Sequence, residues 1–264
     1  MPATRGASAG VPVGVIGMVH LPPLPGAPAW GGSMDAVLHR ATADARALHD
    51  GGVDALLVEN YGDAPFHKTV GPETVAALTA AVLAVRDVTD RPVGVNALRN
   101  DATAALAVAA ATGARFIRIN VHTGGMHTDQ GWIEGRAGET LRLRSRLAPG
   151  VAILADVMVK HATPPPGLTL EEAARDAAVR GRADALIVSG AATGQATALE
   201  DVRTVAGLVD VPVLVGSGVT AATARAALEV AAGAIVGSAL MEGGRAGRPV
   251  DPDRVRSVVE AARG

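Results

Sequence analysis

Eight short apolar runs, separated by helical patterns, constrain the fold of this chain more than any other feature of its sequence. They cover Val13–Val19, Val53–Val58, Pro92–Asn96, Arg115–Val121, Val151–Val157, Ala183–Val188, Val211–Val215 and Gly233–Val236. Their starts lie about 22 to 40 residues apart. Near-continuous Val, Ile and Leu runs are typical of strands that are buried on both faces of a parallel sheet. Strands that alternate with helices indicate an α/β fold.

Helix signals fill the intervals between these runs. Thr169 to Glu172 matches a capping box, and Asp251-Pro252 offers an N-cap and a first-turn proline to the last apolar stripe. No shift in composition marks a linker between domains. We therefore predict one (β/α)8 TIM barrel over residues 13–264, preceded by a flexible N-terminal tail of residues 1–12. An open doubly wound sheet is the alternative.

The composition of the 264 residues argues against several classes of protein. The formal net charge is −2 and only 2% of the residues are aromatic, so a nucleic-acid partner is not expected. The absence of cysteine excludes disulfides and thiolate metal sites, and it fits a reducing compartment. We find neither a signal peptide nor an apolar run of the roughly 20 residues that cross a bilayer. We therefore expect a cytoplasmic protein without a transmembrane segment.

Two glycine-rich turns follow the last two apolar runs. One contains Gly216, Ser217 and Gly218, and the other contains Gly237 and Ser238. Glycine lets the backbone approach an anion closely, and the N-terminus of a following helix offers N–H donors. TIM barrels commonly bind phosphate after strands 7 and 8. We therefore predict that these five residues bind phosphate. A dinucleotide site is not expected, because no acidic residue follows the first turn at the required distance of about 20 positions.

Polar side chains stand at the C-terminal ends of the first six runs, where TIM-barrel enzymes have their active sites. Each alone has an ordinary structural explanation, but in a barrel all of them would converge on one rim. We predict catalytic roles for His20, Glu59, Asp156, Lys160 and His161. We predict substrate contacts for Asn60, Asn96, Arg118, Asn120, His122 and Ser189. The long connections Leu21–Ser33 and His122–Arg136, and the proline-stiffened segment after Lys160, are candidate lids over this rim.

Asp156 and Lys160 are the leading acid–base pair, because a desolvated carboxylate and a nearby ammonium tune each other's pKa. Lys160 has two further interpretations: it forms a Schiff base, or it binds an anionic group as a point charge. Arg118 is expected to hold a carboxylate such as Glu59 or Asp156 in place. His20, Glu59, His122 and Asp156 could gather a divalent cation, but no ligand spacing supports this, so no cofactor is predicted.

Several long motifs resemble the BtpA/SgcQ family, over about residues 13 to 262. They are Ile16–Gly26, Val58–Phe66, Asn96–Asp101, Phe116–His122, Thr128–Gly131, Ala155–Ala162, Leu186–Gly190 and Gly216–Thr220. The resemblance implies a TIM barrel, but it brings no agreed reaction and no agreed catalytic residues. The family is named for a cyanobacterial factor needed for photosystem I accumulation. Its members are often labelled membrane biogenesis proteins, and others look like enzymes of sugar or nucleoside metabolism.

One departure from the family pattern concerns the phosphate site. Family members commonly have a lysine shortly after the last strand, where this chain has Met241. The basic side chain that the family pattern offers is therefore missing. Only Arg245 or Arg248 could substitute for it from a loop.

These observations predict an enzyme that performs acid–base chemistry, of the isomerase or lyase type, on a small phosphorylated sugar or nucleotide-like metabolite. One alternative is a nucleosidase-type hydrolase with Glu59 and Asp156 as paired carboxylates. The other is a non-catalytic assembly or membrane biogenesis factor, as the resemblance implies. The expected partner is a small anionic metabolite, and a homo-oligomer is left open.

Overall fold

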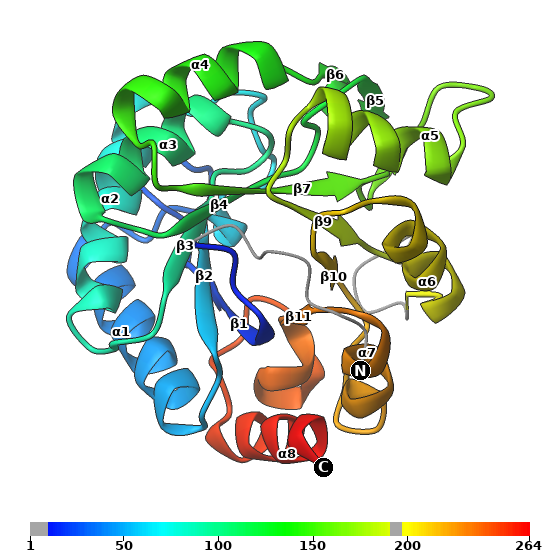
Figure 1. Cartoon of the computed structure of the whole chain (residues 1–264). Helices are drawn as coiled ribbons and strands as arrows, with labels where there is room; N and C mark the ends of the chain where they lie inside the picture. Colours follow the sequence, from blue (N-terminus) through cyan, green and yellow to red (C-terminus); the bar gives the residue numbers. More distant parts are fainter. Residues whose placement is uncertain (1–9, 191–196) are drawn as a thin grey trace.

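A closed barrel of parallel strands forms the centre of the protein (Figure 1). The computed structural model describes residues 10–190 and 197–264. Within these ranges, eight strands close the barrel in the order β1-β11-β10-β9-β7-β4-β3-β2. They are β1 (Gly14–His20), β2 (Ala55–Glu59), β3 (Val93–Asn96), β4 (Phe116–Ile119), β7 (Ala152–Val157), β9 (Ala185–Val188), β10 (Val213–Val215) and β11 (Gly233–Val236). The predicted TIM barrel is confirmed and the open sheet is wrong. Residues 1–9 of the predicted tail lie outside the described residues.

Helices surround the barrel as an outer ring (Figure 1). They are α1 (Met34–Asp50), α2 (Pro72–Arg86), α3 (Ala102–Thr112), α4 (Ala137–Leu147), α5 (Leu170–Arg175), α6 (Leu199–Leu208), α7 (Ala224–Val230) and α8 (Pro252–Arg263). The caps that the sequence predicts are present. Thr169 and Glu172 form the capping box of α5, and the Asp251 side chain accepts two backbone N–H groups at the start of α8.

The barrel interior is packed with apolar side chains and is not a pore. Ile16, Leu57, Phe116 and Leu154 are among the members of this buried cluster. Gly94 on β3 explains how the largest of them fits, since a Cβ at this position would collide with the ring of Phe116 on the neighbouring strand β4. Space for a ligand is therefore confined to one end of the barrel.

A small antiparallel sheet lies beside the C-terminal ends of β4 and β7. The connection after β4 forms the hairpin of β5 (Gly125–Thr128) and β6 (Gly131–Glu134), and β8 (Ala162–Thr163) from the connection after β7 pairs with β5. Met126 and Ile133 of the hairpin are buried with Val121 and Val159 in an apolar cluster of their own. Two of the three candidate lids are thus parts of one sheet, which the sequence analysis did not predict.

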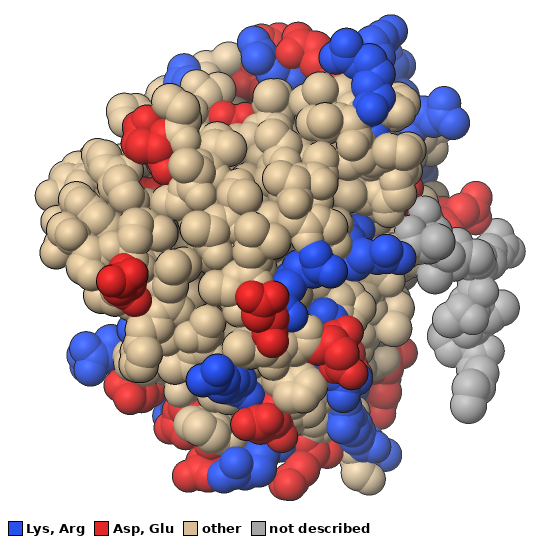
Figure 2. All heavy atoms as spheres, turned by 90° about the vertical axis from the view of Figure 1, so that its left-hand side faces the viewer, with Lys and Arg blue, Asp and Glu red and all other residues tan. Residues whose placement is uncertain are grey.

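The outer surface carries charges of both signs. On the face that includes α1, α2 and α3, acidic and basic side chains are interspersed over the lower half and along the upper margin, and a broad uncharged area lies between them (Figure 2). This face has no basic stripe of the kind that binds nucleic acid. In the part of the chain that the structure describes, no helix is long and apolar enough to span a membrane.

Candidate functional site

A cavity of about 260 Å³ opens at the C-terminal ends of the barrel strands. Many of the residues predicted for the site line it together. These are His20, Glu59, Arg118, Asn120, Lys160, His161, Gly216, Ser217, Gly218, Gly237 and Ser238. Four predicted catalytic side chains and both glycine-rich turns therefore share one cavity. Their roles in catalysis stay predictions.

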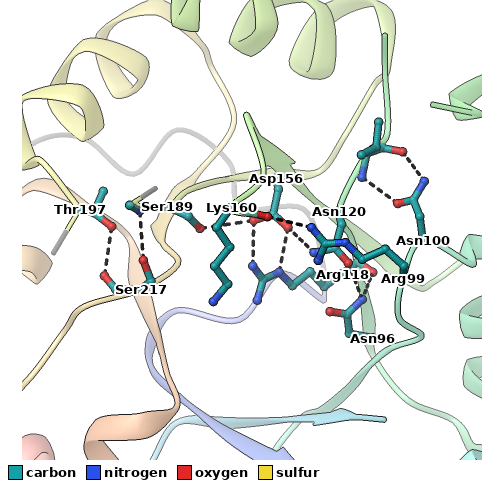
Figure 3. A network of polar contacts seen from close by, with 12 residues as sticks. Asn96, Arg99, Asn100, Arg118, Asn120, Asp156, Lys160, Ser189, Thr197 and Ser217 are labelled. Atoms are coloured by element: carbon teal, nitrogen blue, oxygen red, sulfur yellow. Dashed lines mark hydrogen bonds and ion pairs between the residues drawn. The ribbon is translucent and has the colours of Figure 1, made fainter. Parts of the chain in front are cut away.

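Asp156 lies behind the wall of this cavity and does not line it. Its carboxylate accepts hydrogen bonds from Nε and Nη2 of Arg118 at 3.0 and 2.9 Å, and from Nδ2 of Asn120 at 2.9 Å (Figure 3). This ion pair agrees with the expectation that Arg118 holds a carboxylate in place. Both carboxylate oxygens therefore accept hydrogen bonds from protein donors, and the catalytic role of Asp156 stays a prediction.

Asn96 and Ser189 belong to the same buried network and do not line the cavity either. Asn96 donates from Nδ2 to the backbone carbonyl of Arg118 at 3.1 Å and to Oδ1 of Asn120 at 3.2 Å. Ser189 donates from Oγ to Asp156 at 3.5 Å. The structure thus brings these residues to the rim, where they contact protein groups that support the cavity wall.

Asn60 and His122 lie outside the cavity, contrary to the expected convergence on one rim. The Asn60 side chain accepts the backbone N–H of Leu98 at 2.7 Å and thereby ties together the connections after β2 and β3. The His122 ring bonds through Nε2 to the carbonyl of Gly181 at 2.8 Å. The alternation that would place His122 with Arg118 fails because β4 ends at Ile119.

His20 is held as a neutral ring whose Nε2 faces Glu59. Its Nδ1 accepts the backbone N–H of Gly247 at 3.1 Å, and its ring stacks on Tyr61 with centroids 4.2 Å apart. Burial, followed by the charge of Lys160, lowers the pKa of His20 to about 3. The neutral ring must carry its proton on Nε2, because Nδ1 is an acceptor. Nε2 lies 3.8 Å from Oε1 of Glu59.

Glu59 is the ionisable carboxyl group that lines the cavity. Burial raises its pKa, and the positive charges of Arg118 and Lys160 offset part of that rise. A buried carboxyl group with a raised pKa is a candidate for general acid–base chemistry, and this role of Glu59 stays a prediction.

Lys160 extends from the loop after β7, and its side chain turns away from the Asp156 network (Figure 3). Among the described residues, its ammonium group has no hydrogen bond and no ion pair. Burial lowers the pKa of Lys160, and the nearby charge of Arg118 lowers it further. The backbone around it is tight, since Met158 and His161 have φ values of 53° and 57°. Lys160 is therefore an unpaired donor at the cavity wall.

The two glycine-rich turns, after β10 and β11, bring backbone N–H groups to the cavity. Within residues 10–190 and 197–264, the N–H groups of Gly218, Val219, Ser238 and Ala239 bond to no protein acceptor. Gly218 has a φ of 73°, a left-handed conformation that favours glycine. These residues line the cavity, and backbone N–H groups of this kind can bind an anion, so the phosphate site stays a prediction.

Met241 is fully buried and packs with the apolar interior of the barrel. It does not line the cavity, and neither does Arg245 or Arg248. Arg248 instead lies 3.7 Å from Glu242 on the surface. Neither loop arginine therefore takes the place of the missing lysine at the cavity.

The sequence analysis missed Arg99, which also lines the cavity. Arg99 follows β3, is only 6% exposed, and donates from Nη2 to the backbone carbonyl of Lys160 at 2.8 Å. The available signal was an arginine directly after the apolar pair Ala97-Leu98, at the end of a strand. Leu98 also lines the cavity, together with the aromatic rings of Tyr61 and Phe66.

The candidate cation site does not assemble. Among the described residues, no three His, Asp or Glu side chains are grouped so that they could hold a metal ion. His122, one of the four residues considered for it, bonds to Gly181 away from the cavity.

Comparison with known proteins identifies the family. The model of the BtpA family matches residues 12–264. The chain belongs to the BtpA family. Its relatives in the BtpA family include the photosystem I biogenesis protein BtpA of Synechocystis sp., which is 48% identical over 249 residues, or 94% of this chain and 87% of the relative.

Solved structures share the barrel of this BtpA-family chain at low sequence identity. Thiamine phosphate pyrophosphorylase from Pyrococcus furiosus has a TM-score of 0.59 at 16% identity, covering 95% of this chain and 96% of the other. N-(5'-phosphoribosyl)anthranilate isomerase from the same organism has a TM-score of 0.56 at 15% identity, covering 95% and 98%. At these identities the likeness shows the fold alone.

Proposed function

We propose that this BtpA-family chain is an enzyme that performs acid–base chemistry, of the isomerase or lyase type, on a small phosphorylated sugar or nucleotide-like metabolite. One observation carries the proposal. Glu59 and His20, with perturbed pKa values, line the same cavity as the turns after β10 and β11, where four N–H groups bond to no acceptor in the described part of the chain. Perturbed titratable groups beside an anion site in a cleft are typical of catalytic sites.

The charge balance of the cavity supports an anionic ligand. Arg99, Arg118 and Lys160 line it against one carboxyl group, Glu59, and Asp156 behind the wall neutralises Arg118. Positive charge is therefore in excess in this cavity. A phosphate on the loops after β10 and β11 would complete this balance.

The proposed proton transfer uses Glu59 as the base. In its ionised form Glu59 takes a proton from a carbon next to a carbonyl group of the substrate. His20 donates a hydrogen bond from Nε2 to the oxygen on which negative charge develops, and the ammonium of Lys160 stabilises that charge. Glu59 then returns the proton to a neighbouring atom, which completes an isomerisation, or a bond to a leaving group breaks, which completes an elimination.

This assignment gives Asp156 a positioning role instead of a place in the leading acid–base pair. Its carboxylate is saturated by Arg118 and Asn120. The paired-carboxylate hydrolase loses support for the same reason, since only Glu59 of the two carboxyl groups lines the cavity.

A second candidate function rests on the name of the relative from Synechocystis, which is 48% identical and is described as a photosystem I biogenesis protein. A role in biogenesis could be exercised by binding alone. The names of the two structural neighbours instead contain phosphorylated compounds, thiamine phosphate and phosphoribosylanthranilate, and the shared fold is compatible with such ligands.

The experiment combines binding with a readout of proton abstraction that needs no knowledge of the product. Thermal shifts are measured with inorganic phosphate, ribose 5-phosphate, glucose 6-phosphate and AMP, because a ligand of the native state raises its apparent stability. Ligands that bind are then incubated with the protein in D2O, and exchange of their C–H groups is followed by NMR.

We expect at least one phosphorylated sugar to stabilise the wild type and to exchange a C–H proton. The Glu59→Gln variant should keep the thermal shift and lose the exchange. Absence of any shift would contradict the phosphate site. Exchange that persists in Glu59→Gln would contradict the role of Glu59, and binding without exchange in the wild type would favour the biogenesis alternative.

A further inference from the structure

We propose that the ligand carries a second anionic group, a carboxylate or a second phosphate, and that Arg99 binds it on the side of the cavity opposite the glycine-rich turns. This inference rests on the proposed function, because it takes the phosphate on those turns as its starting point. It assigns a chemical class to the substrate: a small phosphorylated metabolite with a negatively charged group at each end.

The strand order places the two anion sites across the cavity from each other. In the eight-stranded ring, β3 lies four strands from β10, and β4 lies four strands from β11. Strands four apart in such a ring face each other across the barrel axis. Gly216–Gly218 follow β10, whereas Arg99 follows β3. Both line the same cavity, so one ligand can contact both.

Arg99 lacks the counterion that a buried guanidinium requires. It is only 6% exposed, and no carboxylate in the described part of the chain forms an ion pair with it. Within the described residues, the one hydrogen bond of its guanidinium is from Nη2 to the carbonyl of Lys160, a neutral group. Buried charges in proteins are normally paired, because desolvation of an isolated ion is costly.

The neighbours of Arg99 increase the need for an anion. Lys160 lines the same cavity, and its ammonium also has no ion pair within the described ranges. Arg118 is already neutralised by Asp156, so it is not available as the principal partner of a ligand. A guanidinium offers two parallel N–H donors, which match a carboxylate or a phosphate.

The other ionisable groups fit between these two ends. Glu59 ends β2 and His20 ends β1, so both stand on the flank between Arg99 and the loop after β11. Lys160 follows β7, which lies four strands from β1, on the opposite flank. A ligand fixed at both ends would therefore present its central carbons to Glu59 and His20.

The test compares pairs of compounds that differ only in the second charged group. Glyceraldehyde 3-phosphate is compared with 3-phosphoglycerate, and arabinose 5-phosphate with 5-phosphoarabinonate. Affinities are measured by calorimetry for the wild type, Arg99→Met and Arg99→Lys. The matched control is Arg248→Met, which removes an exposed arginine from the same end of the barrel without touching the cavity.

In the wild type, the acid of at least one pair should bind roughly tenfold more tightly than its aldose, as expected for one charge-assisted contact. Arg99→Met should abolish this gain, so that the acid and its aldose phosphate bind the variant with equal affinity. Arg99→Lys should retain part of the gain, and Arg248→Met should retain all of it.

The outcomes separate this inference from the proposed function. Binding of the aldose phosphates with no gain from the carboxylate in either pair would overturn the inference and leave the phosphate site standing. A gain that survives in Arg99→Met would overturn the role of Arg99. If none of the four compounds binds, and inorganic phosphate does not bind either, the result would contradict the proposed function itself. Where Arg99→Met does not fold, the comparison within the wild type still tests the second anionic group, and Arg99→Lys still tests the role of Arg99.

Discussion

Arg118 on β4 and Asp156 on β7 form an ion pair with two parallel hydrogen bonds of 3.0 and 2.9 Å, and both side chains are almost completely buried. The two strands are neighbours in the barrel, paired from Phe116–Ala152 to Ile119–Ala155. The pair thus cross-links the wall at the height where the apolar interior ends and the cavity begins. Its geometry fixes a guanidinium that lines the cavity.

We expect Asp156→Asn to destabilise the fold by about 3–5 kcal/mol, because it leaves the Arg118 charge buried and uncompensated. Urea denaturation followed by circular dichroism measures this loss. Ser189→Ala is the matched control, since its hydroxyl contacts the same carboxylate at 3.5 Å and should contribute well under about 1 kcal/mol. A similar small loss in both variants would show that the pair does not bear on stability. Double replacement by Arg118→Met and Asp156→Leu should recover most of the loss.

The sequence predicted the barrel because each strand is a continuous apolar run and each interval carries helix signals. It also predicted that Glu59, His20 and Lys160 would share a cavity with the glycine-rich turns, since the ends of parallel strands meet at one rim. It could not predict which polar side chains face the cavity. Side chains alternate between the two faces only within a strand. Because β4 ends at Ile119, this alternation does not predict the position of His122.

Two further features depend on contacts that are distant in the sequence. Asp156 lies behind the wall, where Arg118 of the adjacent strand β4 and Asn120, which directly follows β4, donate hydrogen bonds to its carboxylate. Arg99 was missed because an isolated arginine after an apolar pair gives no periodic signal. The pairing of β5 with β8 joins two connections 34 residues apart at Thr128 and Ala162, and neither segment has strong strand character alone.

Two glycines of the phosphate site should respond in opposite ways to alanine. A Cβ on Gly216 would collide with Oγ of Ser189, so Gly216→Ala should destabilise the fold by about 1–3 kcal/mol. A Cβ on Gly237 would lie 3.4 Å from both His20 Cε1 and Met18 Cγ, an ordinary contact. Gly237→Ala should therefore keep its melting temperature and lose affinity for inorganic phosphate. Equal melting temperatures for the two variants would contradict this contrast.

The pKa of His20 predicts how acid weakens the fold. Because burial lowers it from 6.5 to about 3, the unfolded chain takes up this proton below about pH 6.5 while the folded chain does not. The stability that the neutral ring contributes is thus present above pH 6.5 and is lost as the pH falls towards 3. His20→Gln should unfold with a shallower pH dependence in this window. Urea midpoints at several pH values measure the slope, and an unchanged slope would refute the assignment.

The contribution of Glu59 to stability should change with pH in the opposite direction to that of His20. Its folded pKa is raised above the ordinary value of 4.5, so its contribution to stability is fully present below pH 4.5 and is lost as the pH rises through the folded value. Glu59→Gln cannot ionise and should therefore exceed the wild type in stability at pH 8, with a gap that closes towards pH 4. Glu229→Gln, on the exposed surface of α7, should show no such gap. A constant difference at all pH values would mean that burial of the charge is not its cause.

Lys160 tests whether the residues of the cavity reduce the stability of the fold in return for ligand binding. The chain has only one other lysine, the exposed Lys68, which serves as the matched control. Burial lowers the pKa of Lys160, and its ammonium has no counterion in the described part of the chain. Lys160→Met should therefore raise the melting temperature at pH 7, while affinity for a phosphorylated sugar falls roughly tenfold. Lys68→Met should change neither quantity.

The alternative that Lys160 forms a Schiff base is checked by borohydride treatment with an aldose phosphate, followed by mass spectrometry. We expect no adduct on Lys160. A reduced adduct on Lys160 would show that it forms a Schiff base and does not act as a point charge.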